Sequence, residues 1–367
     1  MRVNGVAFRS IWYDEHEKSV KIIDQRWLPY ELRTAFLKTR NDFAIAISDM
    51  WVRGAPLIGA TAAYAIAEEM AVDPSNENLA SAWKHLNETR PTAINLRWAL
   101  TRCKNALEIL PENTRAVAAM KLAHDIAEED VVINQNIGMH TLDLIRKLAA
   151  EKPTGAPINI LTHCNAGWLA TVDWGTATSG MYQAHDAGIP IHVWVDETRP
   201  RNQGGLTSWE LGSHGIPHTY ITDNAGGHLM QHGQVDMVIV GTDRTTSRGD
   251  VCNKIGTYLK ALAAFDNGVP FYVALPSPTI DWTVADGVTE IPIEERQASE
   301  VSHIMGIDSN KNIGTVQITP VGTETGNPAF DVTPNRLITG LITERGITEA
   351  SSKGLLSLFP EFKVQNK

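Results

Sequence analysis

Five short apolar runs alternate with helical stretches in the second half of the chain, and this alternation constrains the fold more than any other feature. The apolar runs cover residues 158–162, 189–195, 218–222, 235–241 and 270–276. The stretches between them, about 167–187, 204–214, 224–233 and 253–267, have helical patterns. Such alternation predicts an α/β fold with a Rossmann-like open, mostly parallel sheet that carries helices on both faces.

The part of the chain before this region reads as helices after a short polar start. Residues 56–71 are rich in alanine and begin with Pro56, which suits a first helical turn. Residues 92–109 and 114–150 continue the helical pattern, and the turn-rich segment EKPTGAP at 151–157 marks a boundary. The length of 367 residues fits about two domains. We therefore predict a mainly helical N-terminal domain, residues 1–150, and a Rossmann-like C-terminal domain, residues 151–367.

Charge and cysteine content narrow the possible partners. The formal net charge is −10, so we expect no nucleic-acid partner and no anionic membrane partner, although a small anionic substrate fits. No apolar run reaches the length of about 18 residues that a membrane span needs, and no signal-peptide core is visible. The three cysteines form no C-x-x-C pair, which favours a reducing, cytoplasmic location.

Polar or reactive side chains follow four of the predicted strands. Ligands of open parallel sheets bind beyond the carboxyl ends of the strands, so four such ends indicate a functional site better than one would. In chain order the four residues are Cys164, Asp196, Asp223 and Asp243.

Two of these residues have both a structural and a catalytic interpretation. Cys164, in the segment LTHCNAG, either packs a tight turn or is a thiol at a helix N-terminus, where the helix dipole would favour the thiolate. Asp243, in VIVGTDR, either caps a turn or is a general acid or base whose pKa a dry site would raise. Downstream, Asp250 is expected to cap a helix with Asn253 and Lys254 in its first turn. A lysine there opposes the dipole, which indicates a ligand contact.

Two arginines precede expected helix starts. Arg53 stands before Gly54-Ala55-Pro56, and Arg90 stands before Pro91-Thr92. A guanidinium beside exposed backbone N–H groups is how proteins bind phosphate, although a plain loop arginine is an equally good interpretation of either stretch alone.

Signals for a cofactor or a metal are weak. Neither a Gly-x-x-x-x-Gly-Lys loop nor a Gly-x-Gly-x-x-Gly fingerprint is found. His228 and His232 lie one helical turn apart, but no third ligand follows at an obvious spacing. We expect no cofactor and no metal.

Several segments together resemble the methylthioribose-1-phosphate isomerase family. The resemblance runs from about residue 10 to 340, in the expected order, and its fold is shared with regulatory subunits of the exchange factor for eukaryotic initiation factor two and with ribose-1,5-bisphosphate isomerase. The segments are RGAPLIGATAAYA, RPTAINLRWAL, LTHCNAG, VDETRPRNQGGLTSWEL, GTDR followed by GDVCNKIGTY, and VALPSPTID.

The resemblance implies an aldose–ketose isomerase of methionine salvage, and so of methionine and amino-acid biosynthesis, which converts 5-methylthioribose 1-phosphate to 5-methylthioribulose 1-phosphate. It implies that Cys164 and Asp243 are catalytic, and that the protein is a homodimer. It also implies that the sugar phosphate is held by Arg53, Gly54, Ala55, Arg90, Gln203, Asn253 and Lys254. Gln203 is assigned by the resemblance alone.

Small departures from the family pattern concern the room around C5 of the sugar, so 5-deoxyribose 1-phosphate is a second candidate substrate. The departures are at Trp168, Trp174, Thr242, Ser247 and Arg248. Two other functions stay open on this fold. One is a ribose-1,5-bisphosphate isomerase, for which Arg199 and Arg201 offer a second phosphate site, and the other is a non-catalytic regulatory subunit.

Overall fold

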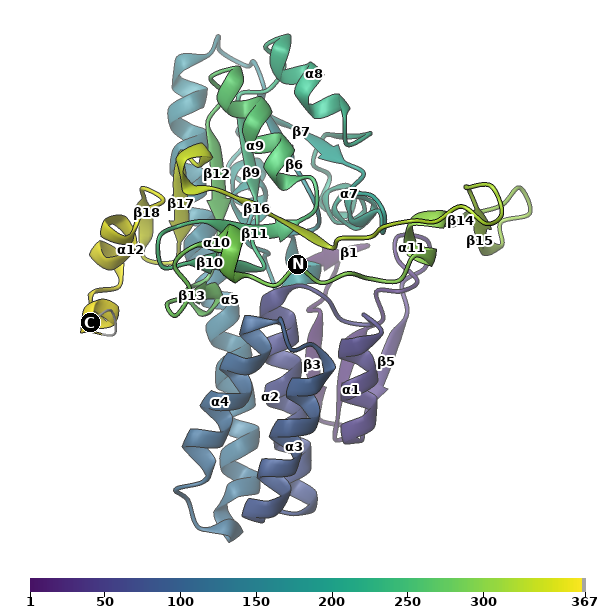
Figure 1. Cartoon of the computed structure of the whole chain (residues 1–367), viewed down its shortest axis with the longest axis vertical. Helices are drawn as coiled ribbons and strands as arrows, with labels where there is room; N and C mark the ends of the chain where they lie inside the picture. Colours follow the sequence, from purple (N-terminus) through teal and green to yellow (C-terminus); the bar gives the residue numbers. More distant parts are fainter. Residues whose placement is uncertain (365–367) are drawn as a thin grey trace.

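The protein has a helical bundle at one end and a large sheet at the other, as the computed structural model shows for residues 1–364 (Figure 1). The bundle helices are α1 (Arg40–Ser48), α2 (Ala55–Val72), α3 (Asn76–Thr89), α4 (Ile94–Leu107) and α5 (Glu112–Glu151). The later helices are α6 (Ser179–Asp186), α7 (Gln203–His214), α8 (Ala225–Gln231), α9 (Thr257–Asp266), α10 (Gly287–Glu290), α11 (Ser299–Ser302) and α12 (Ser352–Leu358).

Seven strands form the large sheet, in the order β18-β17-β12-β9-β6-β7-β8. The five predicted apolar runs are confirmed as β6 (Ile158–Thr162), β7 (Ile191–Asp196), β8 (His218–Ile221), β9 (Met237–Val240) and β12 (Phe271–Ala274). These strands pair in parallel, as does β17 (Gly340–Thr343), and only β18 (Gly346–Thr348) is antiparallel.

Helices cover both faces of this sheet, as the sequence predicts. Ile158 and Ile160 of β6 point to one side, where they pack in a core with α5, α6 and α7. Leu161 of the same strand belongs to a second core on the other side, with α8, α9 and α12. Strands buried on both faces need apolar residues at successive positions, which explains the continuous apolar runs.

The order of the strands reverses between β6 and β9. From β6 the chain moves outward through β7 to β8, and then returns to β9 on the opposite side of β6 and continues through β12 to β17. Loops at such a reversal leave the sheet in opposite directions and open a crevice at the carboxyl ends of the two strands. The segments that follow β6 and β9 carry Cys164 and Asp243.

Smaller sheets complete the fold. The segment before the predicted helices contains strands that the sequence analysis did not predict. They are β3 (Ile11–Asp14), β4 (Ser19–Ile23) and β5 (Thr34–Leu37), in an antiparallel sheet after the short pair β1 (Arg2–Val3) and β2 (Val6–Ala7). A four-stranded sheet contains β13 (Ile280–Asp281), β10 (Arg244–Thr246), β11 (Val251–Lys254) and β16 (Phe330–Thr333). The hairpin of β14 (His303–Ile307) and β15 (Ile313–Gln317) projects from the body (Figure 1).

Two predicted helices differ from the structure. The stretch 167–187 forms only a short 3-10 turn at Trp168–Ala170 before α6, and the stretch 253–267 is helical only from Thr257 onward. Across residues 1–364, no helix has both the length and the apolarity that a membrane span requires. The division into domains at residue 150 stays a prediction.

Candidate active site

One cavity at the strand reversal brings together all nine residues that the sequence analysis assigned to a site. It lies between the start of α2, the end of β6, the end of β9 and strand β11. The nine residues that line it are Arg53, Gly54, Ala55, Arg90, Cys164, Gln203, Asp243, Asn253 and Lys254. Their roles stay proposals, which the geometry below supports.

Cys164 lies just beyond the carboxyl end of β6, in a left-handed backbone conformation with a φ of 69°. Its backbone N–H donates to the Thr198 hydroxyl at 2.8 Å, and that hydroxyl donates to the Asp196 carbonyl at 3.1 Å. A left-handed conformation is costly for a residue with a side chain and persists where neighbouring contacts hold it, often at functional sites. The chain therefore fixes the thiol at the cavity wall.

The expected helix dipole behind Cys164 is wrong, because residues 165–167 form a loop and the next α-helix begins at Ser179. The side chain is only 7% exposed. Burial raises the pKa of the thiol, and the positive charges of Arg53 and Lys254 oppose that rise. Side-chain cations, rather than a helix, are thus what favours the thiolate here.

Asp243 follows β9 on the opposite side of the reversal. Its backbone N–H donates to the Cys252 carbonyl at 3.0 Å, so the segment after β9 is tied to β11. Burial raises the pKa of its carboxyl group, while Lys254, Arg90 and Arg53 lower it. A carboxylic acid in such a setting keeps its proton to higher pH than a solvated one, which suits a general acid.

The start of α2 forms a part of the cavity that is suited to bind a phosphate group. Gly54 has a φ of 90°, and a Cβ atom there would lie 2.4 Å from the Ala170 carbonyl oxygen, so only glycine fits. The Arg53 guanidinium donates to Asn165, through the side-chain oxygen and through the backbone carbonyl at 2.8 Å, and Nη2 lies 3.9 Å from the Cys164 Sγ atom. Helix-start N–H groups beside a fixed guanidinium make an anion site.

Arg90 ends α3 and approaches the cavity from another side. Its Nη2 atom lies 3.3 Å from Oε2 of Glu294, while its Nε atom is buried with no hydrogen-bond partner within residues 1–364. An unpartnered buried donor is costly, so this guanidinium can accept a further anionic ligand.

Asn253 and Lys254 lie on strand β11, not in the first turn of a helix, so the sequence prediction is wrong at this point. Asp250 does not cap that helix either. It accepts from the backbone N–H groups of Gly287 at 3.0 Å and Asn335 at 2.9 Å. The Lys254 ammonium group donates to the Ala329 carbonyl at 2.8 Å, and burial lowers its pKa, while Cys164 and Asp243 oppose that shift.

Gln203 is the first residue of α7 and is buried. Its side-chain oxygen has no hydrogen-bond donor among residues 1–364. Because a buried acceptor without a donor is costly, this oxygen can take a hydroxyl group of a ligand that fills the cavity.

Sequence reasoning missed the residues that hold the site from behind. Asn165 positions Arg53, and its amide in turn donates to Glu210 at 2.9 Å. Glu210 is buried, and burial raises its pKa to about 8. In the sequence, Glu210 is a carboxylate within an expected helix, and such residues are common on solvent-exposed helix faces. Nothing in the sequence therefore marked Glu210 as buried.

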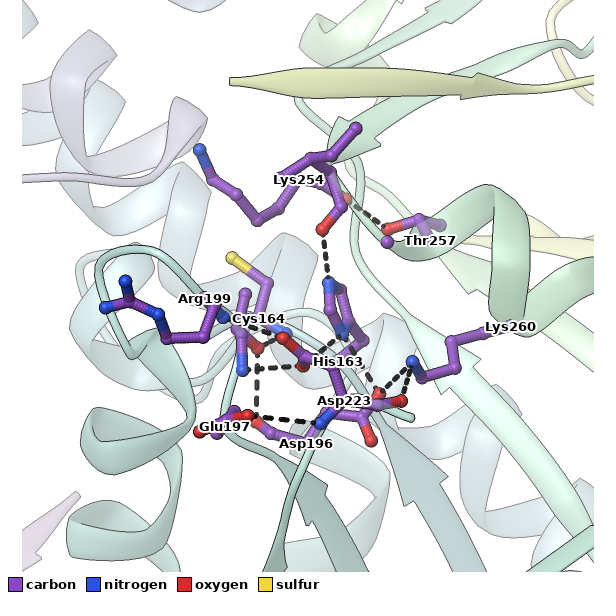
Figure 2. Close-up of polar contacts among 12 residues, drawn as sticks. His163, Cys164, Asp196, Glu197, Arg199, Asp223, Lys254, Thr257 and Lys260 are labelled. Atoms are coloured by element: carbon purple, nitrogen blue, oxygen red, sulfur yellow. Dashed lines mark hydrogen bonds and ion pairs between the residues drawn. The ribbon is translucent and has the colours of Figure 1, made fainter. Parts of the chain in front are cut away.

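A buried cluster behind Cys164 has the residue types of a metal site. His163, Asp196 and Asp223 place potential ligand atoms within 4.8 Å of one another. The Lys260 ammonium group, however, lies 3.2 Å from Oδ2 of Asp196, and Asp223 accepts from the backbone N–H groups of Thr198 and Arg199, both at 2.8 Å (Figure 2). The chain already supplies a cation and donors here, so we assign no metal, which stays a prediction.

The other two histidines considered as metal ligands lie on α8 and directly after it. The rings of His228 and His232 lie 4.2 Å apart between centroids, and Nδ1 of His232 faces the His228 carbonyl at 2.8 Å. Neither histidine lines the cavity that contains Cys164.

The arrangement can move protons on a small phosphorylated ligand. A thiol and a raised-pKa carboxyl group share one cavity with two guanidinium groups and a buried ammonium group. The cations suit a phosphate, the carboxyl group can donate a proton, and the thiol can act at a neighbouring carbon.

Comparison with known proteins gives a consistent result. A family described as the initiation factor 2 subunit family matches residues 51–350. A methylthioribose-1-phosphate isomerase of Sinorhizobium medicae is 64% identical over 362 residues, which cover 98% of this chain and 100% of that protein.

Two solved structures are similar along most of the chain. A 5-methylthioribose 1-phosphate isomerase from Pyrococcus horikoshii OT3 has a TM-score of 0.82 at 38% identity, over 97% of this chain and 96% of that one. A structure described as translation initiation factor eIF-2B, subunit delta, from A. fulgidus has a TM-score of 0.78 at 38% identity, over 96% and 100%.

Proposed function

The chain belongs to the initiation factor 2 subunit family, and from this membership we propose that it is an aldose–ketose isomerase that converts 5-methylthio-D-ribose 1-phosphate to 5-methylthio-D-ribulose 1-phosphate in methionine salvage. Its full-length relatives at this level of identity carry the name of that enzyme. The single structural observation that supports the proposal is that Cys164 and Asp243 face the same cation-lined cavity.

The substrate sets an unusual chemical demand. Its C1 carries a phosphate ester, so the ring cannot open through a free hemiacetal. The bond between C1 and the ring oxygen must break, with a proton added to that oxygen. One hydrogen must then move from C2 to C1, and the C2 hydroxyl must lose its proton to become the ketone. The sum is an isomerisation in which no atom is gained or lost.

Asp243 is the group that protonates the ring oxygen. Its raised pKa keeps the carboxyl group protonated as the pH rises, and the cavity limits the water that would compete with it. Once ionised, the same carboxylate can accept the proton of the C2 hydroxyl, so one residue serves both ends of the reaction.

Cys164 acts at C2, either as the base that removes the hydrogen or as a stabiliser of the charge that develops there. Arg53 and Lys254 lower the pKa of this thiol against the effect of burial, and so favour a thiolate in the cavity. A solvent-deuterium experiment separates the two versions. Label at C1 of the product supports proton transfer with exchange, whereas a product without label excludes exchange with solvent and favours direct transfer of hydride from C2.

The phosphate is held by Arg53, Arg90 and the N–H groups at the start of α2, and the sugar hydroxyl groups by Gln203, Asn253 and Lys254. These groups fix the ring so that C2 faces Cys164 and the ring oxygen faces Asp243, and orientation of this kind lowers the barrier.

The structure favours the monophosphate over a bisphosphate. The guanidinium group of Arg199 donates to the carbonyls of Pro200 at 2.7 Å and Val301 at 2.8 Å, and Arg201 pairs with Glu300 at 2.8 Å. Neither arginine lines the cavity that contains Cys164. A regulatory subunit without catalysis would have no need for the thiol and the carboxyl group that meet there.

The C5 substituent has an apolar wall to contact. Met50, Ala170 and Phe330 line the cavity, whereas Trp168 and Trp174 do not. A methylthio group fills more of this wall than a methyl group. We therefore expect 5-deoxyribose 1-phosphate to be accepted with a kcat/KM about tenfold or more below that of the methylthio sugar.

An isomerisation assay tests the proposal. Purified wild type, Cys164→Ser and Asp243→Asn are supplied with methylthioribose 1-phosphate, 5-deoxyribose 1-phosphate and ribose 1,5-bisphosphate. Ketose formation from the first sugar that falls at least about 10²-fold in both variants, with folding intact, supports the assignment. Preferred turnover of the bisphosphate, or no turnover of any sugar by folded wild type, contradicts it.

The family expectation of a homodimer in the cytoplasm belongs to the same proposal. The expected mass in solution is twice that of the 40.3 kDa chain. Light scattering at assay concentration measures it, and a monomer that retains full activity contradicts the expectation.

A further inference from the structure

The residue before Cys164 is fully buried and joins two segments that line the cavity. His163 is 0% exposed. Its Nε2 atom lies 2.8 Å from the carbonyl oxygen of Ile255, and its Nδ1 atom lies 3.0 Å from Oδ2 of Asp196. Ile255 directly follows Lys254, so one ring connects the end of β6, which carries Cys164, to the segment that carries Lys254.

Both ring nitrogens of His163 face acceptors. A backbone carbonyl can only accept a hydrogen bond, so Nε2 must carry a proton. Nδ1 faces the carboxyl group of Asp196 and, at 3.6 Å, Oδ1 of Asp223, so a proton lies between Nδ1 and the Asp196 oxygen as well. The ring is therefore hydrogen-bonded on both sides, with one proton on Nε2 and one shared between Nδ1 and Asp196.

Charged groups from several elements balance this arrangement. Asp196 ends β7 and Asp223 follows β8, while Lys260 of α9 lies 3.2 Å from Oδ2 of Asp196. From β16, Asp331 accepts from the backbone N–H groups of Gly256 at 2.7 Å and Tyr258 at 3.1 Å. The imidazole ring and an ammonium group thus meet three carboxyl groups, and the cluster joins residues that belong to or directly follow five elements, β6, β7, β8, α9 and β16.

The surroundings leave the ring no freedom to move. A Cβ atom on Gly256 would lie 2.8 Å from Cε1 of His163, and Gly256 has a φ of 105°. On the other side, Asp196 offers its carbonyl to the Thr198 hydroxyl that holds Cys164. Figure 2 shows the Cys164 thiol and the Lys254 ammonium group on one side of the His163 ring and Lys260 on the other.

We propose that His163 is a positioning residue, whose ring, hydrogen-bonded through both nitrogens, holds Cys164 and Lys254 in their places at the cavity. Only the kinetic readout of this proposal rests on the proposed function. The position of Cys164 can be measured without any substrate.

Site-resolved alkylation measures that position. Iodoacetamide is applied to wild type, His163→Gln and Asp196→Asn, and each cysteine is followed by mass spectrometry. Loss of the ring contacts frees the Cys164 segment, which relieves the burial that raises the thiol pKa. We expect Cys164 to react several-fold faster in His163→Gln, and by a smaller factor in Asp196→Asn, whose amide can still donate to Nδ1. Cys103 is buried in α4 with a pKa of about 12 and reports global loosening, so its labelling should stay unchanged.

A matched control comes from the neighbouring strand. His192 lies on β7, and its Nε2 atom contacts the Thr219 hydroxyl at 3.0 Å, outside the cluster. His192→Gln should leave the alkylation of Cys164 and the kinetic constants unchanged.

The protonation of the ring is measured by nitrogen NMR on protein with labelled histidine. The His163 signals are identified by their loss in His163→Gln. We expect Nε2 of His163 to carry a proton in wild type, as its contact with the Ile255 carbonyl requires, and the Nδ1 signal to change in Asp196→Asn, where an amide replaces the carboxyl group. A wild-type Nε2 without a proton overturns the proposal.

Kinetics complete the test. We expect His163→Gln to lower kcat about tenfold or more and to raise KM by a smaller factor, because the thiol and Lys254 shift while Arg53 and Arg90 stay in place to hold the phosphate. Unchanged kcat together with unchanged alkylation of Cys164 overturns the positioning role. If wild type turns over no sugar phosphate, the proposed function fails, and alkylation and NMR still decide the role of His163. If the labelling of Cys103 and of Cys164 rises by the same factor in His163→Gln, the positioning role is overturned and the variant is generally destabilised.

Discussion

The Nη2 atom of Arg90 lies 3.3 Å from the Oε2 atom of Glu294, so a carboxylate of the chain itself pairs with one of the two arginines proposed to hold phosphate. Glu294 also pairs with Arg296 at 2.8 Å, and Arg296 pairs with Glu300 at 2.8 Å. Residues 294–300 are therefore linked to Arg90 by a series of ion pairs. The substrate phosphate must compete with the Glu294 carboxylate for Arg90.

Replacing this competitor should strengthen phosphate binding. In Glu294→Gln the carboxylate is lost while the side-chain volume is kept, and we expect KM to fall about three- to tenfold, in line with about 1 kcal/mol for a partly exposed pair. Inhibition by inorganic phosphate should strengthen in parallel. Glu295→Gln, whose wild-type carboxylate accepts from the backbone N–H of Asn327, is the matched control. A higher KM in Glu294→Gln would show instead that Glu294 orients Arg90.

The pH profile of kcat should respond to Lys254. Burial raises the pKa of Asp243 and of Cys164, and the Lys254 charge opposes both shifts. Without that charge both pKa values rise further, so the whole profile of Lys254→Met should move to higher pH, with macroscopic values that belong to the pair. Lys254→Arg keeps the charge and should leave the profile in place. A shift to lower pH in Lys254→Met is the contrary result.

Two buried carboxyl groups should make the protein less stable as the pH rises. Burial raises the pKa of Asp130 to about 7 and that of Glu210 to about 8, well above the usual pKa values of these side chains. The unfolded chain therefore releases these protons first. The contribution of each group to the free energy of unfolding is complete below its pKa in the unfolded chain. It is lost as the pH rises through its pKa in the folded protein, by up to roughly a few kcal/mol per group.

Urea unfolding at pH 5 and pH 8 measures this loss. Asp130→Asn cannot ionise, and its side-chain oxygen can still accept from the backbone N–H of Val172, as Asp130 does at 2.7 Å. We expect this variant to lose less stability between the two pH values than wild type. Asp125→Asn, at a partly exposed position of the same helix, should behave as wild type. An equal loss in wild type and Asp130→Asn would contradict the assignment.

Gly167 should tolerate no side chain. A Cβ atom there would lie 1.7 Å from Oε2 of Glu210, which holds Asn165 and through it Arg53. Gly167→Ala should therefore cost about 1–3 kcal/mol of unfolding free energy and raise KM. Gly306→Ala, where nothing lies within 4 Å of the new atom, should change neither. Thermal unfolding and steady-state kinetics measure both effects, and wild-type values in Gly167→Ala would contradict them.

The sequence predicted the large sheet well because its signal is local. A parallel strand buried on both faces needs successive apolar residues, and the five runs were therefore visible. The common edge of their carboxyl ends placed Cys164 and Asp243 near each other before any contact was known. The resemblance added Gln203, whose position at the start of α7 no local pattern had marked as special.

The errors fall where distant residues decide the local structure. The segment after Cys164 is not helical, since the backbone N–H of Leu169 donates to Glu210 at 2.6 Å and that of Val172 donates to Asp130 at 2.7 Å. Asn253 and Lys254 are on a strand because β11 pairs with β16, more than 70 residues later in the chain. Local propensity carries no information about such partners.

Helix α5 has a mechanical consequence for the whole molecule. Its 40 residues make a rod of about 60 Å. The first half, with Ala123 and Ile126, belongs to the core of the bundle, and the second half, with Ile137 and Ile145, belongs to the core beneath the sheet. The two ends of the protein are therefore connected by one continuous helix rather than by a hinge. A division of the chain near residue 150 would separate the sheet from the half of α5 that packs against it, and relative movement of the two ends must bend this helix.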